Sequence, residues 1–241
     1  MRTAIPILLL FLSLTAKAHE MWLQPAKADL QPLQVDIIVG QNFRGAKGVW
    51  IPPSVARAET IRGPQRQAIT GRFGDLPAIT IDDASGLDRL IYQSEPETLR
   101  YNQPEKFQSF GEHKGYPDLL ARHQQRNLAG RIVELYTRYA KLLVAQDQLD
   151  QLMIEFVVAR DRASAQLFWQ DQPLPNHRVH LYIADQVQLL TTDASGRIPL
   201  PQIDQAMLLD AVVIEPIVED EASWHSHWAS TYIAQELVTV P

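Results

Sequence analysis

Apolar and polar residues alternate with a period of two along many short stretches of this chain, which is the pattern of half-buried β-strands. Turn sequences and sixteen prolines spread along the chain separate these stretches. The pattern predicts strands at 21–24, 33–39, 78–81, 89–93, 153–158, 165–169, 179–184, 187–191, 197–200, 207–214 and 228–237. Short strands at this spacing predict an all-β protein made of β-sandwiches.

Two segments break this pattern. Residues 104–130 are polar and irregular, and a short helix can begin at Pro117, so we expect a short helical or irregular insertion there. In residues 132–144 the apolar positions fit a helical stripe with charged residues on the other face, yet the same residues would also make a long twisted strand. Both alternatives stay open for this segment.

The beginning of the chain has the features of a secretory signal peptide. Arg2 precedes an apolar run at 5–14, and Ala16-Lys17-Ala18 matches an A-x-A cleavage site. The run is shorter than the stretch of about 20 residues that crosses a bilayer, and no later segment has the pattern of a membrane helix. We therefore expect a signal peptide at 1–18 and an exported, periplasmic protein, without a membrane span, that begins at His19.

A soft boundary near 146–162 divides the rest of the chain. We expect an N-terminal β-sandwich domain at 19–150 and a C-terminal Ig-like β-sandwich domain at 151–241. The predicted fold is therefore two Ig-like β-sandwich modules packed together, with the insertion around 104–130 between strands.

Charge and cysteine content narrow the possible partners. The formal net charge is −6, and loss of Arg2 and Lys17 with the signal peptide would make it −8. An acidic surface has no electrostatic reason to bind nucleic acid or an anionic membrane. The chain has no cysteine, so a metal site would have to use histidine, carboxylate, amide, methionine or the chain end.

Several histidines are candidate metal ligands. An N-terminal His19 would offer its free amine and its imidazole, which together chelate borderline metals such as copper, nickel or zinc. In the sequence Trp224-His225-Ser226-His227-Trp228 the two histidines share one face if the segment is a strand, and the other three residues point toward the core. We predict His19, His227 and His225 as metal ligands, with His227 deeper in the strand and His225 near the preceding loop. His113, in a polar loop, is a weaker candidate.

Other polar residues are expected to be structural. His177 and His180 are three apart, which places them on opposite faces of a strand, and we expect both on the surface. Arg138 and Lys141 are expected on a solvated face, with Tyr139 packed in the core. The chain has no nucleophile elbow, phosphate-binding loop, dinucleotide fingerprint or H-E-x-x-H motif. We therefore expect a binding protein and not an enzyme.

Motifs along the chain carry a resemblance to a known family. Residues 172–200 are similar to Ig-like modules of the carboxypeptidase-regulatory type, through Pro173-Leu174, Val179, Leu181-Tyr182, Thr192-Asp193 and Gly196-Arg197. With the start His19-Glu20-Met21-Trp22-Leu23-Gln24-Pro25, the middle Arg138-Tyr139-Ala140-Lys141 and the end Trp224-His225-Ser226-His227-Trp228-Ala229-Ser230-Thr231, most of the mature chain resembles the DUF4198 family of exported proteins. The chain departs from that family at Tyr232, often Thr there, and at Gln41, where some relatives have a histidine. The resemblance implies an association with nickel or cobalt uptake and a metal-uptake transporter as partner.

These observations favour a periplasmic protein that binds a divalent transition metal, nickel, cobalt or copper, and assists its uptake or delivery. One alternative is a copper-dependent oxidative enzyme that uses a histidine brace, which would need an open coordination position and often a flat aromatic surface for its substrate. The other is an Ig-like binding or scaffold module without a metal, in which His19 is incidental.

Overall fold

The structure is a computed structural model that describes residues 19–27, 31–126, 132–219 and 222–234. The predicted signal peptide lies outside the described residues. Strands make up 53% of the structure and helices 10%, which confirms the prediction of an all-β protein. Within the described residues, no helix combines the length and the apolar character needed to cross a membrane.

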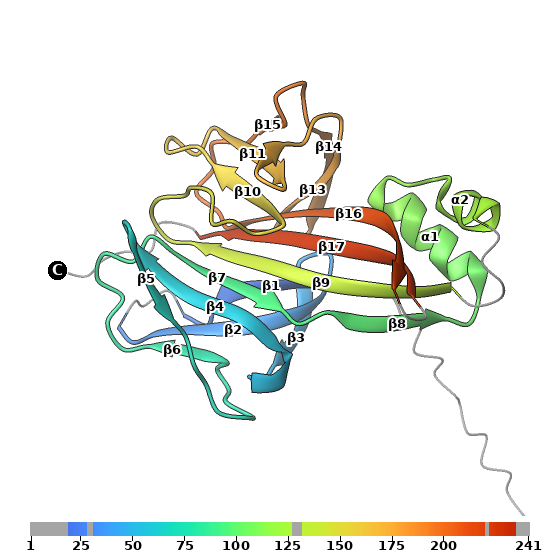
Figure 1. Cartoon of the computed structure of the whole chain (residues 1–241). Coiled ribbons are helices and arrows are strands. Elements are labelled where there is room, and N and C mark those ends of the chain that lie inside the picture. The colour runs from blue at the N-terminus through green and yellow to red at the C-terminus, as the bar shows by residue number, and fades with distance from the viewer. Residues whose placement is uncertain (1–18, 28–30, 127–131, 220–221, 235–241) are drawn as a thin grey trace, which may run out of the picture.

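A nine-stranded sheet forms the centre of the molecule (Figure 1). Its order is β14-β13-β16-β17-β9-β7-β4-β5, and β8 also pairs with β9. β9 and β17 are parallel, whereas the other paired strands of this sheet are antiparallel. The strands are β4 (Val55–Arg62), β5 (Gln65–Ala68), β7 (Arg89–Ser94), β8 (Glu97–Tyr101), β9 (Ile132–Leu143), β13 (Arg178–Ile183), β14 (Gln186–Thr191), β16 (Met207–Glu219) and β17 (Ala222–Ile233).

Two smaller sheets cover opposite faces of the central sheet (Figure 1). One contains β1 (Glu20–Pro25), β2 (Leu33–Gln41), β3 (Arg44–Gly48) and β6 (Ile79–Ile81). The other contains β10 (Ile154–Val158), β11 (Ser164–Trp169), β12 (Gln172–Pro173) and β15 (Arg197–Pro199). A short 3-10 helix, η1 (Pro52–Ser54), precedes β4. We call the faces of the central sheet the β1 face and the β10 face, after the small sheet that each one meets.

Alternation along the central strands supplies a hydrophobic core on each face. Leu142 and Leu208 belong to the core that includes β1 and β2, whereas their neighbours Leu143 and Leu209 belong to the core that includes β10 and β11. Successive side chains of a strand point to opposite faces. A strand that is covered on both faces therefore carries apolar residues at consecutive positions instead of alternating them with polar ones. The central sheet takes strands from both sides of residue 150, so the two predicted modules share it through the β9–β17 pair.

Two helices cover one end of the β1 face. They are α1 (Pro104–Lys114) and α2 (Leu119–Gln125), so the predicted insertion around 104–130 is helical in its described part. Phe107 and Leu119 pack with Trp224 and Trp228 in a third core. α1 ends where Gly115 adopts a left-handed conformation, with φ of 95°, which glycine adopts at little cost.

The ambiguous segment 132–144 is a strand. β9 is buried on both faces: Ala140 and Leu142 contact the β1 side, and Tyr139 and Leu143 contact the β10 side. A central strand covered on both faces has no solvated face, so its apolar residues do not alternate with polar ones. The apolar positions of β9 therefore lack a period of two, and their fit to a helical stripe is a coincidence.

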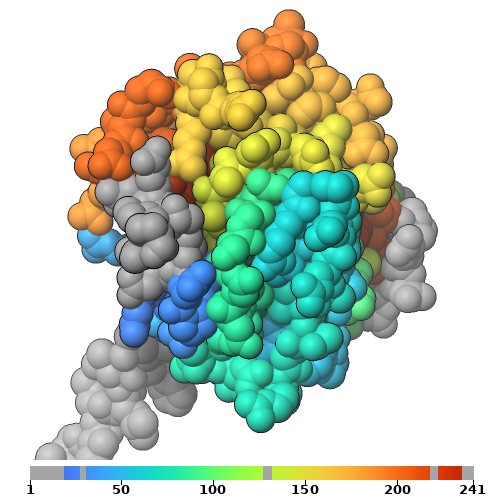
Figure 2. Space-filling model, turned by 90° about the vertical axis from the view of Figure 1, so that its left-hand side faces the viewer, coloured from blue at the N-terminus to red at the C-terminus, as the bar shows by residue number. Residues whose placement is uncertain are grey.

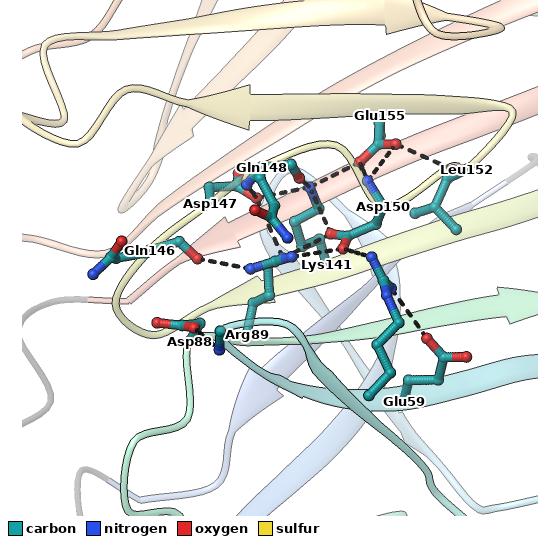
Figure 3. Close-up of polar contacts among 12 residues, drawn as sticks. Glu59, Asp88, Arg89, Lys141, Gln146, Asp147, Gln148, Asp150, Leu152 and Glu155 are labelled. Atoms are coloured by element: carbon teal, nitrogen blue, oxygen red, sulfur yellow. Dashed lines mark hydrogen bonds and ion pairs between the residues drawn. The ribbon is translucent and has the colours of Figure 1, made fainter.

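The expectation that Lys141 lies on a solvated face was wrong. Its side chain is 1% exposed, and its ammonium nitrogen lies 2.8 Å from Asp147, 3.0 Å from Glu155 and 3.2 Å from Asp150. Arg89, equally buried, donates two hydrogen bonds of 2.8 Å to Asp150 (Figure 3). Buried charges are tolerated when each is paired in this way.

This charged cluster lies where the two halves of the chain meet. Arg89 is on β7 and Lys141 on β9, whereas Asp147 and Asp150 come from the segment that leads into β10 and Glu155 from β10 itself. In the space-filling view, the yellow-green segment around residues 140–150 lies against the green and cyan segments of β7, β4 and β5 (Figure 2).

Candidate metal centre

A long hairpin of β16 and β17 positions the candidate ligands. Residues 207–216 of β16 pair with residues 224–233 of β17, so that Glu215 lies directly opposite His225 and Val213 opposite His227. Because residues two apart in a strand share a face, His225 and His227 point to the same side, where Glu215 joins them from the neighbouring strand.

Glu215, His225 and His227 form a compact group of potential metal ligands. Each offers one ligand atom, and these three atoms all lie within 4.8 Å of one another. The two imidazole rings have centroids 3.9 Å apart, and His227 Nε2 lies 3.0 Å from a carboxylate oxygen of Glu215. Among the described residues, this is the one such group of three or more histidine, cysteine and carboxylate side chains.

The surroundings hold the two rings in place on the β10 face. Thr137 Oγ1 lies 3.0 Å from His225 Nε2, and the Tyr139 hydroxyl lies 3.3 Å from His227 Nδ1. The ring of Trp169 on β11 meets His227 edge to face, with centroids 4.9 Å apart. Such outer contacts orient imidazole ligands in metal proteins.

Burial sets the protonation of this group. Burial, and to a smaller extent the charge of His225, lowers the pKa of the His227 imidazole to about 3. His227 is therefore neutral near pH 7, the form in which imidazole binds a metal. Burial also raises the pKa of Glu215 above its ordinary value. The His227 side chain is 3% exposed and that of Glu215 is 39% exposed, so the group opens to solvent on the glutamate side.

The other face of β17 matches the sequence prediction. Trp224, Ser226 and Trp228 are all buried, the two tryptophans in the helical core. His225 lies within β17 and not in the loop before it, and it is more exposed than His227, as expected for the outer member of the pair.

The structure does not bring His19 together with this pair. The carbonyl oxygen of His19 accepts a hydrogen bond of 3.4 Å from Arg138. Arg138 points to the β1 face, because its neighbours Thr137 and Tyr139 on β9 contact the two histidines on the β10 face. The expected convergence of His19, His225 and His227 on a single ion is therefore not found, since the sheet separates them.

Two further expectations about histidines were wrong. His113 lies in the last turn of α1 and not in a loop, because the helix continues to Lys114 and ends only at Gly115. His180 is 2% exposed, because β13 lies inside the central sheet beneath α1. His177 is half-buried, and its Nε2 lies 3.1 Å from the Val212 carbonyl oxygen.

Glu215 is the member of the group that the sequence did not indicate. The strand predicted at 207–214 ends one residue before it, whereas β16 continues to Glu219. Residues 220–221, which follow β16, lie outside the described residues. The signal that identifies Glu215 is the strand register, since the antiparallel pairing of β16 with β17 places position 215 opposite position 225.

Comparisons with known proteins add nothing to these observations. No protein-family model, no curated protein and no solved structure matches the chain.

Proposed function

We propose that this protein is an exported, periplasmic metal-binding protein that holds a divalent transition metal at Glu215, His225 and His227. The observation that carries the proposal is the meeting of three ligand atoms within 4.8 Å at one end of the β16–β17 hairpin. Two imidazoles and one carboxylate suit borderline divalent ions, so nickel, cobalt and copper are the candidates.

The surroundings of the group fit reversible binding. Three protein ligands leave further coordination positions for water or for a receiving protein, and the exposed part of Glu215 gives an ion a way in and out. We therefore assign the protein a role in metal uptake or delivery, with a metal-uptake transporter as its expected partner. The resemblance of the sequence motifs to exported, nickel- or cobalt-associated proteins supports the same role.

An oxidative copper enzyme is less well supported by the geometry. A histidine brace needs the chain end and two imidazoles on one ion, but the sheet lies between His19 and the pair at 225 and 227. Trp22, Trp224 and Trp228 are buried, so these three rings offer no flat aromatic surface to a substrate.

Calorimetric titration of the untagged chain beginning at His19 with NiCl₂, CoCl₂ or CuSO₄ tests the proposal. Because each variant removes one ligand, Glu215→Gln, His225→Ala and His227→Ala should weaken the binding of one ion by at least about tenfold. His177→Ala is the matched control, because this half-buried histidine of the same domain binds a backbone carbonyl away from the group.

The affinities of these variants distinguish a metal site at Glu215, His225 and His227 from a protein without one. Loss of affinity in all three ligand variants with normal binding by His177→Ala supports the site. Binding by all three variants that equals the wild type would exclude Glu215, His225 and His227 as ligands. Elemental analysis of untagged protein purified from the periplasm identifies the ion, and a wild-type chain that binds none of the three metals would refute the function.

A further inference from the structure

The central sheet ends in a strand whose outer side is open. In the described part of the chain, β14 pairs with β13 on one side and with no strand on the other. An unpaired edge presents a row of N–H and C=O groups that can pair with a further strand. β14 pairs with β13 over its whole length without a register shift, so no bulge turns this edge away from a partner.

Other edge strands of the molecule carry charges that discourage such pairing. β5, at the far end of the central sheet, has four residues, and its Arg66 forms ion pairs with Glu59 at 3.2 Å and with Asp150 at 2.9 Å. β3, at the edge of its small sheet, carries Arg44 and Lys47. Charged residues, prolines and bulges are the usual protection of an edge strand. β14 contains no charged residue and no proline, so it lacks this protection.

β14 also exposes two large apolar side chains on one face. Val187 is 48% exposed and Leu189 is 63% exposed. Val187 lies opposite Tyr182 of β13, which belongs to the core on the β1 face, and Leu189, two residues further on, points to the same face. Leu190 packs against the core on the β10 face, so Gln188 points to that face. The edge therefore has an apolar strip on the β1 face beside its open backbone groups.

We propose that β14 pairs antiparallel with β14 of a second copy of this chain, about a two-fold axis at Gln188. In this register Val187 lies opposite Leu189 of the second copy, and the reverse pair forms on the other side of the axis. Apolar pairs directly opposite each other stabilise neighbouring strands. The contact is isologous, so it closes at two copies, and the two central sheets become one continuous sheet.

Charge favours both this occupant and this register. Asp185, just before β14, forms an ion pair with Arg44 of its own chain, so the edge offers no unpaired charge that would select a charged peptide. In the register about Gln188, Asp185 lies opposite Thr191 of the second copy. A register about Leu189 would bring Asp185 near Asp193 of the second copy, and one about Val187 would set Asp185 against an apolar leucine. The register about Gln188 avoids both costs.

Sedimentation velocity of the untagged chain beginning at His19, over a range of protein concentrations, tests the association. The wild type should show a monomer–dimer equilibrium, and EDTA should leave it unchanged because no metal takes part. Leu189→Lys should raise the Kd of the dimer at least about tenfold, because a charge on an edge strand opposes pairing. Leu76→Lys is the matched control, since Leu76 is 57% exposed and lies outside β14. Circular dichroism checks that both variants fold.

Disulfide cross-linking tests the register, because the chain has no cysteine of its own. Residues directly opposite each other in an antiparallel pair have Cα atoms about 4.5–5.5 Å apart, which a disulfide can bridge. Gln188→Cys should therefore form covalent dimers under mild oxidation. Gln186→Cys is the control on the same strand and face, because its two copies would lie four residues, or about 14 Å, apart along the strand.

The results separate this proposal from the metal site, which shares no residue with β14. A concentration-dependent dimer that Leu189→Lys weakens and Leu76→Lys keeps supports the pairing, whether or not the protein binds metal. A wild type that stays monomeric would overturn it and leave the edge to an extended segment of another protein. A dimer that Leu189→Lys leaves unchanged, or cross-linking of Gln188→Cys no faster than that of Gln186→Cys, would overturn it as well.

Discussion

Glu134 is a buried carboxyl group at the helical end of the central sheet. It is 0% exposed, and it accepts hydrogen bonds from the Tyr101 and Ser226 hydroxyls. Burial raises its pKa from 4.5 to about 7, although both hydrogen bonds and the charge of Arg138 act in the opposite direction. The folded protein therefore holds a proton on Glu134 that the unfolded chain releases.

A pH dependence of stability follows from this proton. Between pH 4.5 and 7 the native state binds more protons than the unfolded state at this group, so the free energy of unfolding falls as the pH rises through this window. The full effect is on the order of 3 kcal/mol. Glu134→Gln cannot ionise, so its stability should fall less over this window than that of the wild type.

Urea denaturation at pH 4.5, 5.5, 6.5 and 7.5 measures this slope. Glu105→Gln, which removes an exposed carboxyl from α1, controls for the general change in charge. Equal slopes for Glu134→Gln and the wild type would show that the native state does not protonate Glu134.

At the level of elements, the sequence predicted those strands and shared strand faces that follow from the local alternation of apolar and polar residues. The strands around Trp22, Val35 and Leu167 lie where the period of two placed them, within one or two residues. The shared face of His225 and His227 follows from the same rule. Each of these features depends on residues that are close together in the chain.

Features that depend on distant pairing could not be predicted in this way. β9 has no polar face, so its alternation is lost. Glu215 joins the two histidines only through the hairpin register. The stacking of His113 on His180 requires α1 to pack over β13, which no local pattern indicates. Lys141 looked solvated because its carboxylate partners Asp147, Asp150 and Glu155 lie beyond the end of β9, and no local pattern brings them back to it.

The β2–β3 hairpin provides a test of backbone packing. Gly40 on β2 faces Gly45 on β3, and a Cβ atom on Gly40 would lie 2.0 Å from the Arg44 carbonyl oxygen and 2.4 Å from the Gly45 Cα atom. These are backbone atoms, which cannot turn aside. Gly40→Ala should therefore lower the free energy of unfolding by about 1–3 kcal/mol, the usual cost of overpacking.

Gly48 in the same hairpin is the matched control. A Cβ atom there would have its nearest contact at 3.4 Å, with the Ile37 carbonyl oxygen, so Gly48→Ala should change stability by no more than about 0.5 kcal/mol. Thermal or urea denaturation of both variants compares them directly. A Gly40→Ala protein as stable as Gly48→Ala would mean that the strands separate here without cost.

At the scale of the whole molecule, the buried charged cluster joins the two halves of the chain. Lys141 faces Asp147, Asp150 and Glu155, and it also donates to the carbonyl oxygens of Gln148 and Phe156. Burial alone would lower the pKa of Lys141, but attraction from the three carboxylates outweighs it and raises the pKa above its ordinary value. The ammonium is therefore charged at any pH at which the protein works.

Removing this one charge should destabilise the whole fold. In Lys141→Met the side chain keeps its approximate size, but Asp147 and Glu155 lose their ammonium partner and Asp150 keeps only its arginines. Breaking a buried pair from one side costs about 3–5 kcal/mol, because a buried charge is left uncompensated. Since β9 pairs with both β7 and β17, the loss should appear as one earlier unfolding transition of both halves.

Urea denaturation followed by tryptophan fluorescence and by circular dichroism measures this effect, with Lys106→Met on the exposed side of α1 as the control. The control should stay within about 0.5 kcal/mol of the wild type. Added salt screens surface charges but reaches buried pairs poorly, so 0.5 M NaCl should not remove the difference between the two variants. If Lys141→Met unfolds at the same urea concentration as Lys106→Met, the cluster contributes no net stability, and packing across the shared sheet alone holds the halves together.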